Sequence, residues 1–126
     1  MSDNYRTSIL EEAIQLINGD RNDAYGDPVE DFKTTASLWQ TYLSRTMEAR
    51  GHLVLMPHDI AVMMDLLKIA RISWSPEKRD HWADLGGYTG LGWDCVNRQE
   101  VPIACFYCDN GYLCDCGGAE SAQERL

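Results

Sequence analysis

The stretch PHDIAVMMDLLKIARISWSPEKRDHWADLGGY, residues 57–88, decides the fold of this chain. It predicts two helices, because Pro57 and the Ser75-Pro76 pair each provide a helix start. The first of these helices is apolar on almost every side, which is typical of a central buried helix. The chain is therefore expected to be all-α, with its other helices packed around this one.

The same two helices carry lines of charge. Asp65, Lys68 and Arg71 lie along one line of the first helix, and Asp80 and Asp84 share a face of the second. Carboxylates one turn apart can share a Mg²⁺, while a nearby cation neutralises phosphate. We expect the three acids to hold magnesium and the two bases to contact a phosphate. The alternative is an interhelical salt-bridge cluster without a ligand.

Two more helices are expected before residue 57. Ser8 begins a capping box, and the first helix would end near Asn18. Residues 19–28 are rich in turn-forming residues, so this stretch is predicted to have no regular secondary structure. Asp27 then caps the longest helix, which Gly51 ends after roughly 22 residues.

Beyond Gly90 the sequence predicts irregular structure, with short strands at 101–107 and around Tyr112. The fold predicted is a bundle of about four helices with a small irregular zinc-binding C-terminal tail. Three parts are expected: a helical domain at 1–95, a four-cysteine knuckle at 96–118 and a flexible tail at 119–126.

Composition excludes several classes of protein. The chain has 126 residues, 44% of them hydrophobic and 25% charged, and a formal net charge of -9. This length supports one compact domain, and the negative charge disfavours direct binding to nucleic acid or to an anionic membrane. The N-terminus does not resemble a signal peptide, and no apolar run is long enough to span a bilayer. A soluble cytoplasmic protein is expected.

The loop before the longest helix is a candidate ligand site. Arg21 and Tyr25 lie where backbone N–H groups bind anions and aromatic rings stack on bases, so they are candidates to hold a base or sugar. The alternative is a simple turn. We expect His58 at a helix start and both His52 and His81 at the surface.

Four cysteines predict a structural zinc site. Their spacing is Cys105-x2-Cys108-x5-Cys114-x-Cys116, with an Asn-Gly turn in the centre that would bring four thiolates together. An iron-sulfur cluster and free or disulfide-bonded cysteines remain alternatives. Cys95 would either replace one ligand or be a buried thiol.

Three runs carry a family resemblance. They are NGDRNDAYGDPVEDF at 18–32, PHDIAVMMDLLKIARI at 57–72 and DHWADLGGYTGLGWDC at 80–95. They resemble a family of small phage and prophage proteins, and that family is similar to the all-α nucleotide pyrophosphohydrolases of the MazG and dimeric dUTPase group. The cysteine run also resembles the zinc modules of DnaJ-type proteins.

The resemblance implies a function. Members of the pyrophosphohydrolase group are dimers or tetramers that use Mg²⁺ to hydrolyse nucleoside triphosphates, with acidic motifs E-x-x-E and E-x-x-D. Asp80 and Asp84 resemble the outer acids of the second motif, and Asp65 resembles the start of the first. Lys68 and His81 stand where the group has acids.

Three functions therefore remain open. The first is a Mg²⁺-dependent nucleotide pyrophosphohydrolase. In it Asp65, Asp80 and Asp84 would be the catalytic, metal-binding residues, and a carboxylate would take a proton from a metal-activated water. The second is a phage protein that binds and sequesters a nucleotide without turnover. The third is an acidic phage protein that inhibits a host factor. If the chain is encoded by a phage, it would act in the cytoplasm of the host cell. The resemblance also implies that it forms a homo-oligomer, a dimer or a tetramer.

Overall fold

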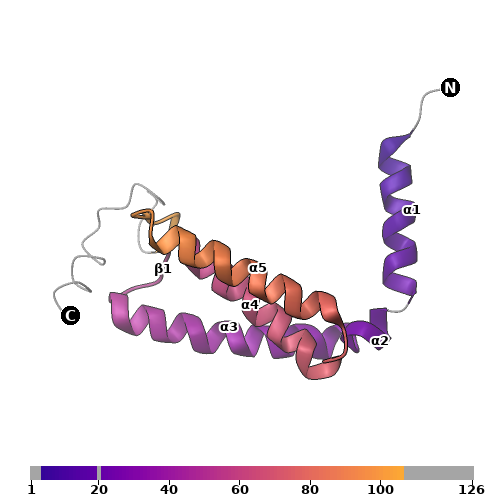
Figure 1. Ribbon diagram of the computed structural model, residues 1–126, viewed down its shortest axis with the longest axis horizontal. Coiled ribbons are helices and arrows are strands. Elements are labelled where there is room, and N and C mark those ends of the chain that lie inside the picture. The colour runs from indigo at the N-terminus through magenta and orange to yellow at the C-terminus, as the bar shows by residue number, and fades with distance from the viewer. Residues whose placement is uncertain (1–3, 20, 107–126) are drawn as a thin grey trace.

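The three longest helices form the body of the protein, and the helix nearest the N-terminus stands across one end of it (Figure 1). The computed structural model describes residues 4–19 and 21–106. The predicted all-α class is confirmed, because five helices and one pair of two-residue strands make up the regular structure of these residues. In chain order these elements are α1 (Tyr5–Asn18), α2 (Arg21–Tyr25), α3 (Pro28–Arg50), β1 (Val54–Leu55), α4 (Pro57–Trp74), α5 (Arg79–Val96) and β2 (Ala104–Cys105).

The boundaries of α3 and α4 follow from local chemistry. The Asp27 side chain accepts hydrogen bonds from the backbone N–H groups of Val29 and Glu30, at 3.1 and 3.3 Å. Gly51 ends α3 in the left-handed region at φ 88°, where glycine has no steric penalty. The predicted longest helix is therefore confirmed, and α4 begins at Pro57 as predicted.

Two predictions before α3 were wrong. The first helix begins at Tyr5 rather than at Ser8, because the Asn4 side chain caps it by accepting from the Thr7 N–H at 3.2 Å. The stretch expected to be irregular contains α2. This short helix is held at its end by a hydrogen bond from the Gly26 N–H to the Asn22 carbonyl at 2.8 Å.

The expected change to irregular structure at Gly90 was also wrong. Helix α5 continues through four glycines and ends at Val96. Gly92 is buried against α4, and a Cβ built there would lie 3.0 Å from the Cβ of Ala61. Because Gly92 has no side chain, the backbones of α4 and α5 can approach closely here, and this packing offsets the low helix propensity of glycine.

The Gly92 contact makes a testable prediction. Gly92→Leu would force a large side chain between α4 and α5 and lower the free energy of unfolding by about 1–3 kcal/mol. Gly87→Leu is the matched control, because nothing lies within 4 Å of a Cβ at Gly87 and leucine favours helix more than glycine does. Urea denaturation of both variants checks this. Equal effects of the two substitutions would contradict the packing argument.

The segment after α5 returns to the start of α4. Strands β1 and β2 pair antiparallel, with Val54 opposite Cys105 and Leu55 opposite Ala104. The strand predicted within 101–107 is therefore confirmed, while its partner β1 was not predicted. Cys108, Cys114 and Cys116 lie outside the described residues, as do the strand expected near Tyr112 and the tail 119–126, so the zinc site stays a prediction.

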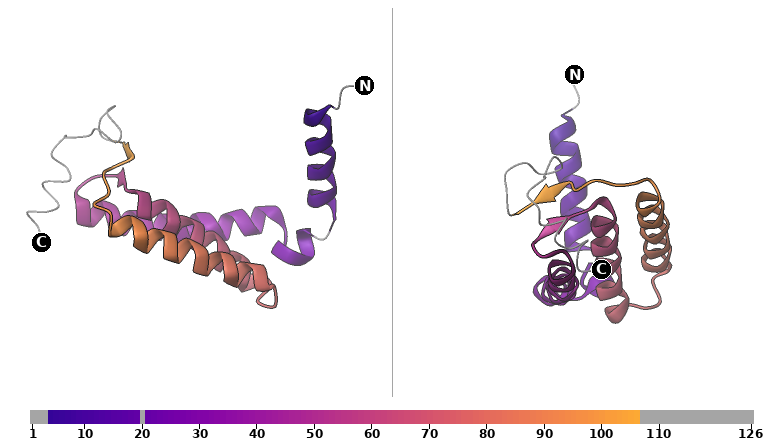
Figure 2. Two further views of the ribbon diagram at one scale, coloured as in Figure 1. Left: turned by 45° about the horizontal axis from the view of Figure 1, so that its top comes forward. Right: turned by 90° about the vertical axis from the view of Figure 1, so that its left-hand side faces the viewer.

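Helix α4 packs against both α3 and α5, as expected of a central helix (Figure 2). The buried residues of the described chain are nevertheless mostly polar or small. The hydrophobic ones are Ala24, Val54 and Ala70, and the polar ones are Asp31, Thr35, His52, Asp59, Ser75 and His81. Specific polar contacts therefore hold much of the bundle together. None of the helices in 4–19 and 21–106 combines the length and hydropathy of a membrane-spanning segment.

Candidate functional site

A cavity of about 530 Å³ lies where α1, α2 and the start of α5 meet. We call it the α2–α5 cavity. Its size is in the range of small-molecule and cofactor sites, about 300–1,000 Å³. The residues that line it are Leu16, Ile17, Arg21, Ala24, Tyr25, Glu77, Lys78, Arg79, Asp80 and His81.

The charges of this cavity differ from those of the chain as a whole. Three cations line it, from Arg21, Lys78 and Arg79, against two carboxylates, from Glu77 and Asp80. The whole chain carries a formal charge of -9. A locally cationic cavity in an acidic protein attracts anions and concentrates them there.

Buried Asp31 organises one side of this region. Its Oδ2 lies 3.1 Å from Arg21 Nη2 and 3.7 Å from Arg71 Nε, and its side chain is only 1% exposed. Arg21 also donates from Nη1 to the Gly26 carbonyl at 3.1 Å. One carboxylate thus holds two guanidinium groups that the sequence places 50 residues apart.

The Tyr25 ring contacts both arginines that are predicted to bind a ligand. The guanidinium carbon of Arg71 is 4.2 Å from the ring centroid and that of Arg21 is 5.4 Å away. These are cation–π distances, and they restrict the orientation of the ring. The structure therefore brings together Arg21, Tyr25 and Arg71, three of the four residues predicted to bind a substrate.

His81 is buried, with 3% of its surface exposed, so its expected surface position was wrong. Its Nε2 lies 3.2 Å from Ser75 Oγ, and the Ser75 hydroxyl donates its single proton to the Ala24 carbonyl in a short hydrogen bond. Ser75 therefore accepts a hydrogen bond from His81 Nε2–H. The other ring nitrogen, Nδ1, is buried and has no hydrogen-bond partner among the described residues.

The three predicted magnesium ligands are separated in the described structure. Asp80 lines the α2–α5 cavity, whereas Asp84 is exposed and forms an ion pair with Lys68 at 2.8 Å. The Lys68 hydrogen bond and charge hold the pKa of the Asp84 carboxyl below its usual value. Asp65 accepts from the Thr89 hydroxyl at 2.7 Å.

Asp65 lines a second cavity, separate from the α2–α5 cavity. Its volume is about 240 Å³, and it lies between α4 and α5 and also contains His58 and Thr89. Within residues 4–19 and 21–106, no three His, Cys, Asp or Glu side chains come together as a metal site. The magnesium site therefore stays a prediction, and the contact between Lys68 and Asp84 has the geometry of the alternative, an interhelical salt bridge.

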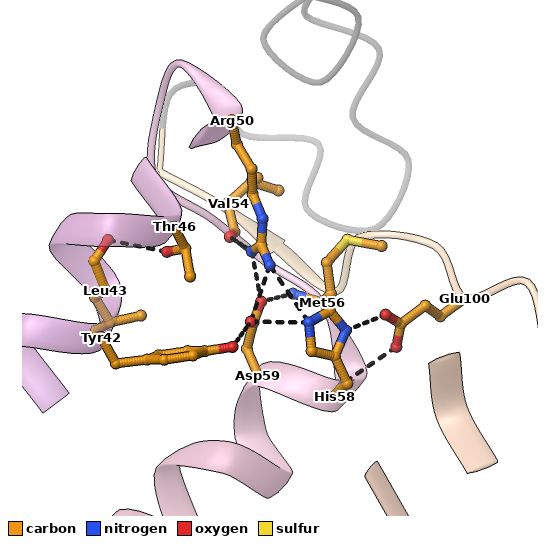
Figure 3. Close-up of polar contacts among 9 residues, drawn as sticks. All are labelled: Tyr42, Leu43, Thr46, Arg50, Val54, Met56, His58, Asp59 and Glu100. Carbon is orange, nitrogen blue, oxygen red and sulfur yellow. Dashed lines mark hydrogen bonds and ion pairs between the residues drawn. The ribbon is translucent and has the colours of Figure 1, made fainter. Parts of the chain in front are cut away.

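A second polar cluster, absent from the predicted site, lies at the start of α4 (Figure 3). Asp59 is completely buried and accepts hydrogen bonds from Arg50 Nη1 at 2.6 Å, Arg50 Nη2 at 3.0 Å and the Tyr42 hydroxyl at 2.5 Å. The Met56 N–H donates to it at 2.7 Å. We call Tyr42, Arg50, Met56, His58, Asp59 and Glu100 the Asp59 network.

This network shifts the titration of its members. Burial alone would raise the pKa of Asp59, but hydrogen bonds from Arg50, Tyr42 and the Met56 N–H lower it below its usual value. Burial, with the hydrogen bond to Asp59, raises the pKa of Tyr42. The hydrogen bond to Asp59 also raises the pKa of Arg50. Asp59 is thus held as a carboxylate beside a neutral Tyr42.

His58 connects the network to the segment after α5. The Glu100 carboxylate accepts from the His58 N–H at 3.0 Å and makes a short contact with His58 Nδ1, while Nε2 lies 3.3 Å from Asp59 (Figure 3). The prediction that His58 lies at a helix start is confirmed, because it is the second residue of α4. His52 is buried, with 8% of its surface exposed, so its expected surface position was also wrong. The acceptors of the Asp59 network are occupied by groups of the chain itself, so its role is structural.

One sequence pattern could have pointed to Asp59, although the sequence-based prediction did not single it out. It is the third residue of α4, and its carboxylate accepts from the backbone N–H of Met56, the residue before that helix. An acid at the third helical position that accepts from the N–H of the N-cap residue forms one half of a capping box. Arg50 and Glu100 lie in other segments and carry no comparable local pattern.

Comparison with known proteins places the chain among phage proteins. A family model described as "Domain of unknown function (DUF6378)" matches residues 8–96. A "Gene 55 protein" of Mycobacterium phage D29 is 42% identical over 97 residues, covering 76% of this chain and 56% of that protein. A "Gene 55 protein" of Mycobacterium phage L5 is 42% identical over 95 residues, covering 75% of this chain and 54% of that protein. This chain therefore spans about half the length of these curated relatives. No solved structure matches it.

Proposed function

This chain belongs to the DUF6378 family. We propose that it binds a phosphorylated nucleotide in the α2–α5 cavity. The two relatives are phage proteins, as the family resemblance predicted. The similarity to MazG-type enzymes and to DnaJ-type zinc modules stays a prediction. The proposal therefore rests on the cavity.

The observation that carries the proposal is the set of cations in this cavity. Lys78 and Arg79 lie at the start of α5, and Arg21 reaches the cavity from α2. Phosphate groups bind favourably beside such side chains because charge-assisted hydrogen bonds are short and strong. A volume of about 530 Å³ is large enough for a ligand of nucleotide size.

The remaining side chains suit the rest of a nucleotide. The Tyr25 ring lines the cavity, where its accessible part can contact a base. His81 also lines the cavity, and its Nδ1 is a polar atom without a hydrogen-bond partner among the described residues, available to a polar group of the base or sugar. The cavity thus combines contacts for charged, aromatic and hydrogen-bonding parts of one ligand.

Binding without turnover is favoured over hydrolysis. Asp84 forms an ion pair with Lys68, and Asp65 lines the other cavity. One observation keeps Mg²⁺-dependent hydrolysis as a second candidate: Asp80 lines the proposed nucleotide site, where it could hold a metal that bridges to phosphate. If hydrolysis occurs, Asp80→Asn would abolish release of pyrophosphate.

Nucleotide binding is tested by isothermal titration calorimetry, with a panel of nucleoside mono-, di- and triphosphates, each with and without Mg²⁺. At least one nucleotide is expected to bind, and Lys78→Glu combined with Arg79→Glu should weaken it by at least about tenfold, or 1.4 kcal/mol. Lys33→Glu with Arg45→Glu provides the matched control. These exposed cations lie on α3 and make only solvent-exposed ion pairs.

Two outcomes would overturn the proposal. One is that no nucleotide of the panel binds to the folded wild-type protein. The other is that the cavity variant and the α3 variant weaken binding equally, which would indicate a nonspecific effect of net charge. Measuring pyrophosphate release in the same samples separates binding from turnover.

A further inference from the structure

The cavity that contains Asp65 differs in character from the proposed nucleotide site. We call it the α4–α5 cavity. None of the described residues that line it is a Lys or an Arg. Trp93 and Val96 border it at the protein surface, since they are 69% and 45% exposed. Most of its lining is aliphatic or aromatic, from Ala61, Val62, Tyr88, Gly92, Trp93 and Val96.

Asp65 supplies the only carboxylate among the described residues that line this cavity. Its Oδ2 accepts a hydrogen bond from the Thr89 hydroxyl at 2.7 Å. Its Oδ1 is buried and has no hydrogen-bond partner in residues 4–19 and 21–106, which is unfavourable for a carboxylate oxygen. The last torsion of an Asp side chain is broad, so a small rotation can present either oxygen to the cavity. A ligand that donates a hydrogen bond here would satisfy the carboxylate.

The cationic side chains closest to Asp65 in α4 are engaged with other acids. His58 also lines the cavity, but its Nδ1 contacts Glu100 and its Nε2 lies 3.3 Å from Asp59 (Figure 3). Lys68, one helical turn after Asp65, forms its ion pair with a carboxylate of α5. Asp65 therefore gives the α4–α5 cavity a negative charge, which attracts cations.

We propose that the α4–α5 cavity binds a small organic cation, with an ammonium or amidinium group on an apolar body. The charged group would donate to Asp65, and such charge-assisted hydrogen bonds are short and strong. The apolar body would lie against Trp93 and the aliphatic lining, which removes apolar surface from water. A cavity of about 150 Å³ can hold benzene. The α4–α5 cavity, at about 240 Å³, therefore has room for one ring that carries a charged group.

This ligand is opposite in charge to the phosphate proposed for the α2–α5 cavity, so the inference does not rest on nucleotide binding. A bare Mg²⁺ ion suits the α4–α5 cavity less well, because it prefers several oxygen ligands and retains bound water. The lining offers one carboxylate among mainly apolar side chains. An organic cation matches both the charged and the apolar part of this lining.

Benzamidine and benzamide test the proposal on the wild-type protein. The two molecules have nearly the same shape, but at neutral pH benzamidine carries a charged amidinium group and benzamide is uncharged. Isothermal titration calorimetry is expected to show saturable binding of benzamidine to one site, with benzamide at least about tenfold weaker. This comparison needs no substitution, so it does not depend on how a variant folds.

Asp65→Asn tests the carboxylate itself. It nearly preserves the shape of the side chain and removes its charge, so it should weaken benzamidine binding by at least about tenfold and change benzamide binding little. Asp94→Asn is the matched control, because Asp94 lies on α5 outside the cavity lining and pairs with Arg98 at the surface. This control should bind benzamidine as the wild type does. Circular dichroism verifies that both variants are folded.

Nuclear magnetic resonance of isotope-labelled protein locates the bound probe. Benzamidine should shift the backbone N–H signals of Thr89 and Gly92, which line the α4–α5 cavity. It should leave those of Lys78 and Arg79, which line the other cavity, in place. Excess Mg²⁺ should displace benzamidine no more than sodium chloride does at the same ionic strength.

Several results would each overturn the inference. They are no binding of benzamidine to the folded protein, equal binding of benzamide, benzamidine binding that Asp65→Asn leaves unchanged, and signals that shift only around the α2–α5 cavity. Specific displacement by Mg²⁺ would also overturn it and would indicate a metal site instead. The nucleotide titration reports on the other cavity, so either proposal can fail without the other.

Discussion

Asp59→Asn is expected to lower the free energy of unfolding by about 3–5 kcal/mol, because the substitution leaves the buried guanidinium of Arg50 without its counter-charge. Arg50 is 19% exposed at its side chain and lies 2.6 Å from Asp59, which is completely buried. For a chain of this size the loss corresponds to a fall of about 10–20 °C in the melting temperature. Thermal unfolding followed by circular dichroism measures it.

Asp94→Asn serves as the control for this substitution. Asp94 forms an ion pair with Arg98 at 3.0 Å, but both side chains are more than half exposed. Exposed pairs contribute about 0–1 kcal/mol, so this variant should unfold close to the wild-type temperature. If Asp59→Asn and Asp94→Asn had similar effects, the Asp59 network would not be the structural element described above.

The effect of Asp59→Asn should also depend on pH. The pKa of Asp59 is lower in the folded protein than the value of about 3.9 expected in the unfolded chain. Such a carboxyl contributes stability above the unfolded value and loses it as pH falls through the folded value. The stability difference between wild type and Asp59→Asn is therefore full near neutral pH and decreases below about pH 4. A constant difference down to pH 2 would contradict this assignment.

The opposite sign applies to Tyr42, whose pKa is raised above the unfolded value of about 10. Its contribution is present below that value and is lost as pH rises through the folded pKa. The Asp59 network therefore supports the fold across a window from about pH 4 to about pH 10.

Asp31→Asn is expected to lower the free energy of unfolding by a similar amount, about 3–5 kcal/mol. Asp31 is the carboxylate that neutralises both Arg21 and Arg71, and these side chains are 13% and 17% exposed. Without it, two guanidinium groups would lie close together in a poorly solvated site. Chemical denaturation measures the loss.

Glu30→Gln is the matched control for Asp31→Asn, since it removes one charge at the neighbouring position. Glu30 and its partner Lys33 are both about 70% exposed, with 3.7 Å between their charged atoms. A second test adds Arg71→Met to Asp31→Asn. Because that change removes one unpaired cation, the double variant should be more stable than the sum of the two single effects predicts. Strict additivity would contradict a direct interaction between Asp31 and Arg71.

Sequence patterns located the parts of this fold that depend on neighbouring residues. The cap at Asp27, the glycine at Gly51 and the proline at Pro57 defined the ends of α3 and the start of α4 because each acts on backbone groups within one turn. The extent of α5 could not be obtained in this way. Glycine lowers helix propensity locally, and only the contact between Gly92 and Ala61 shows what offsets it.

The candidate site was predictable in part for the same reason. Arg21 and Tyr25 were selected from their position before a helix, and Arg71 from its line of charge in a buried helix. The structure places all three near Asp31, which had no distinguishing pattern in the sequence. The Asp59 network was missed as a unit because Tyr42, Asp59 and Glu100 come from separate segments and meet only after packing.

The pairing of β2, which follows α5, with β1, which precedes α4, affects the order in which the protein folds. Helices α4 and α5 are neighbours in the chain and can form a helical hairpin from local contacts, which is a fast event. The pairing of Val54 with Cys105 and the contact of His58 with Glu100 instead join residues 51 and 42 positions apart. Because closing such a long loop costs entropy before any contact compensates for it, β1 and β2 should pair late. The hairpin brings their ends together and shortens the effective loop, so folding of α4 and α5 sets the rate at which the strands can meet.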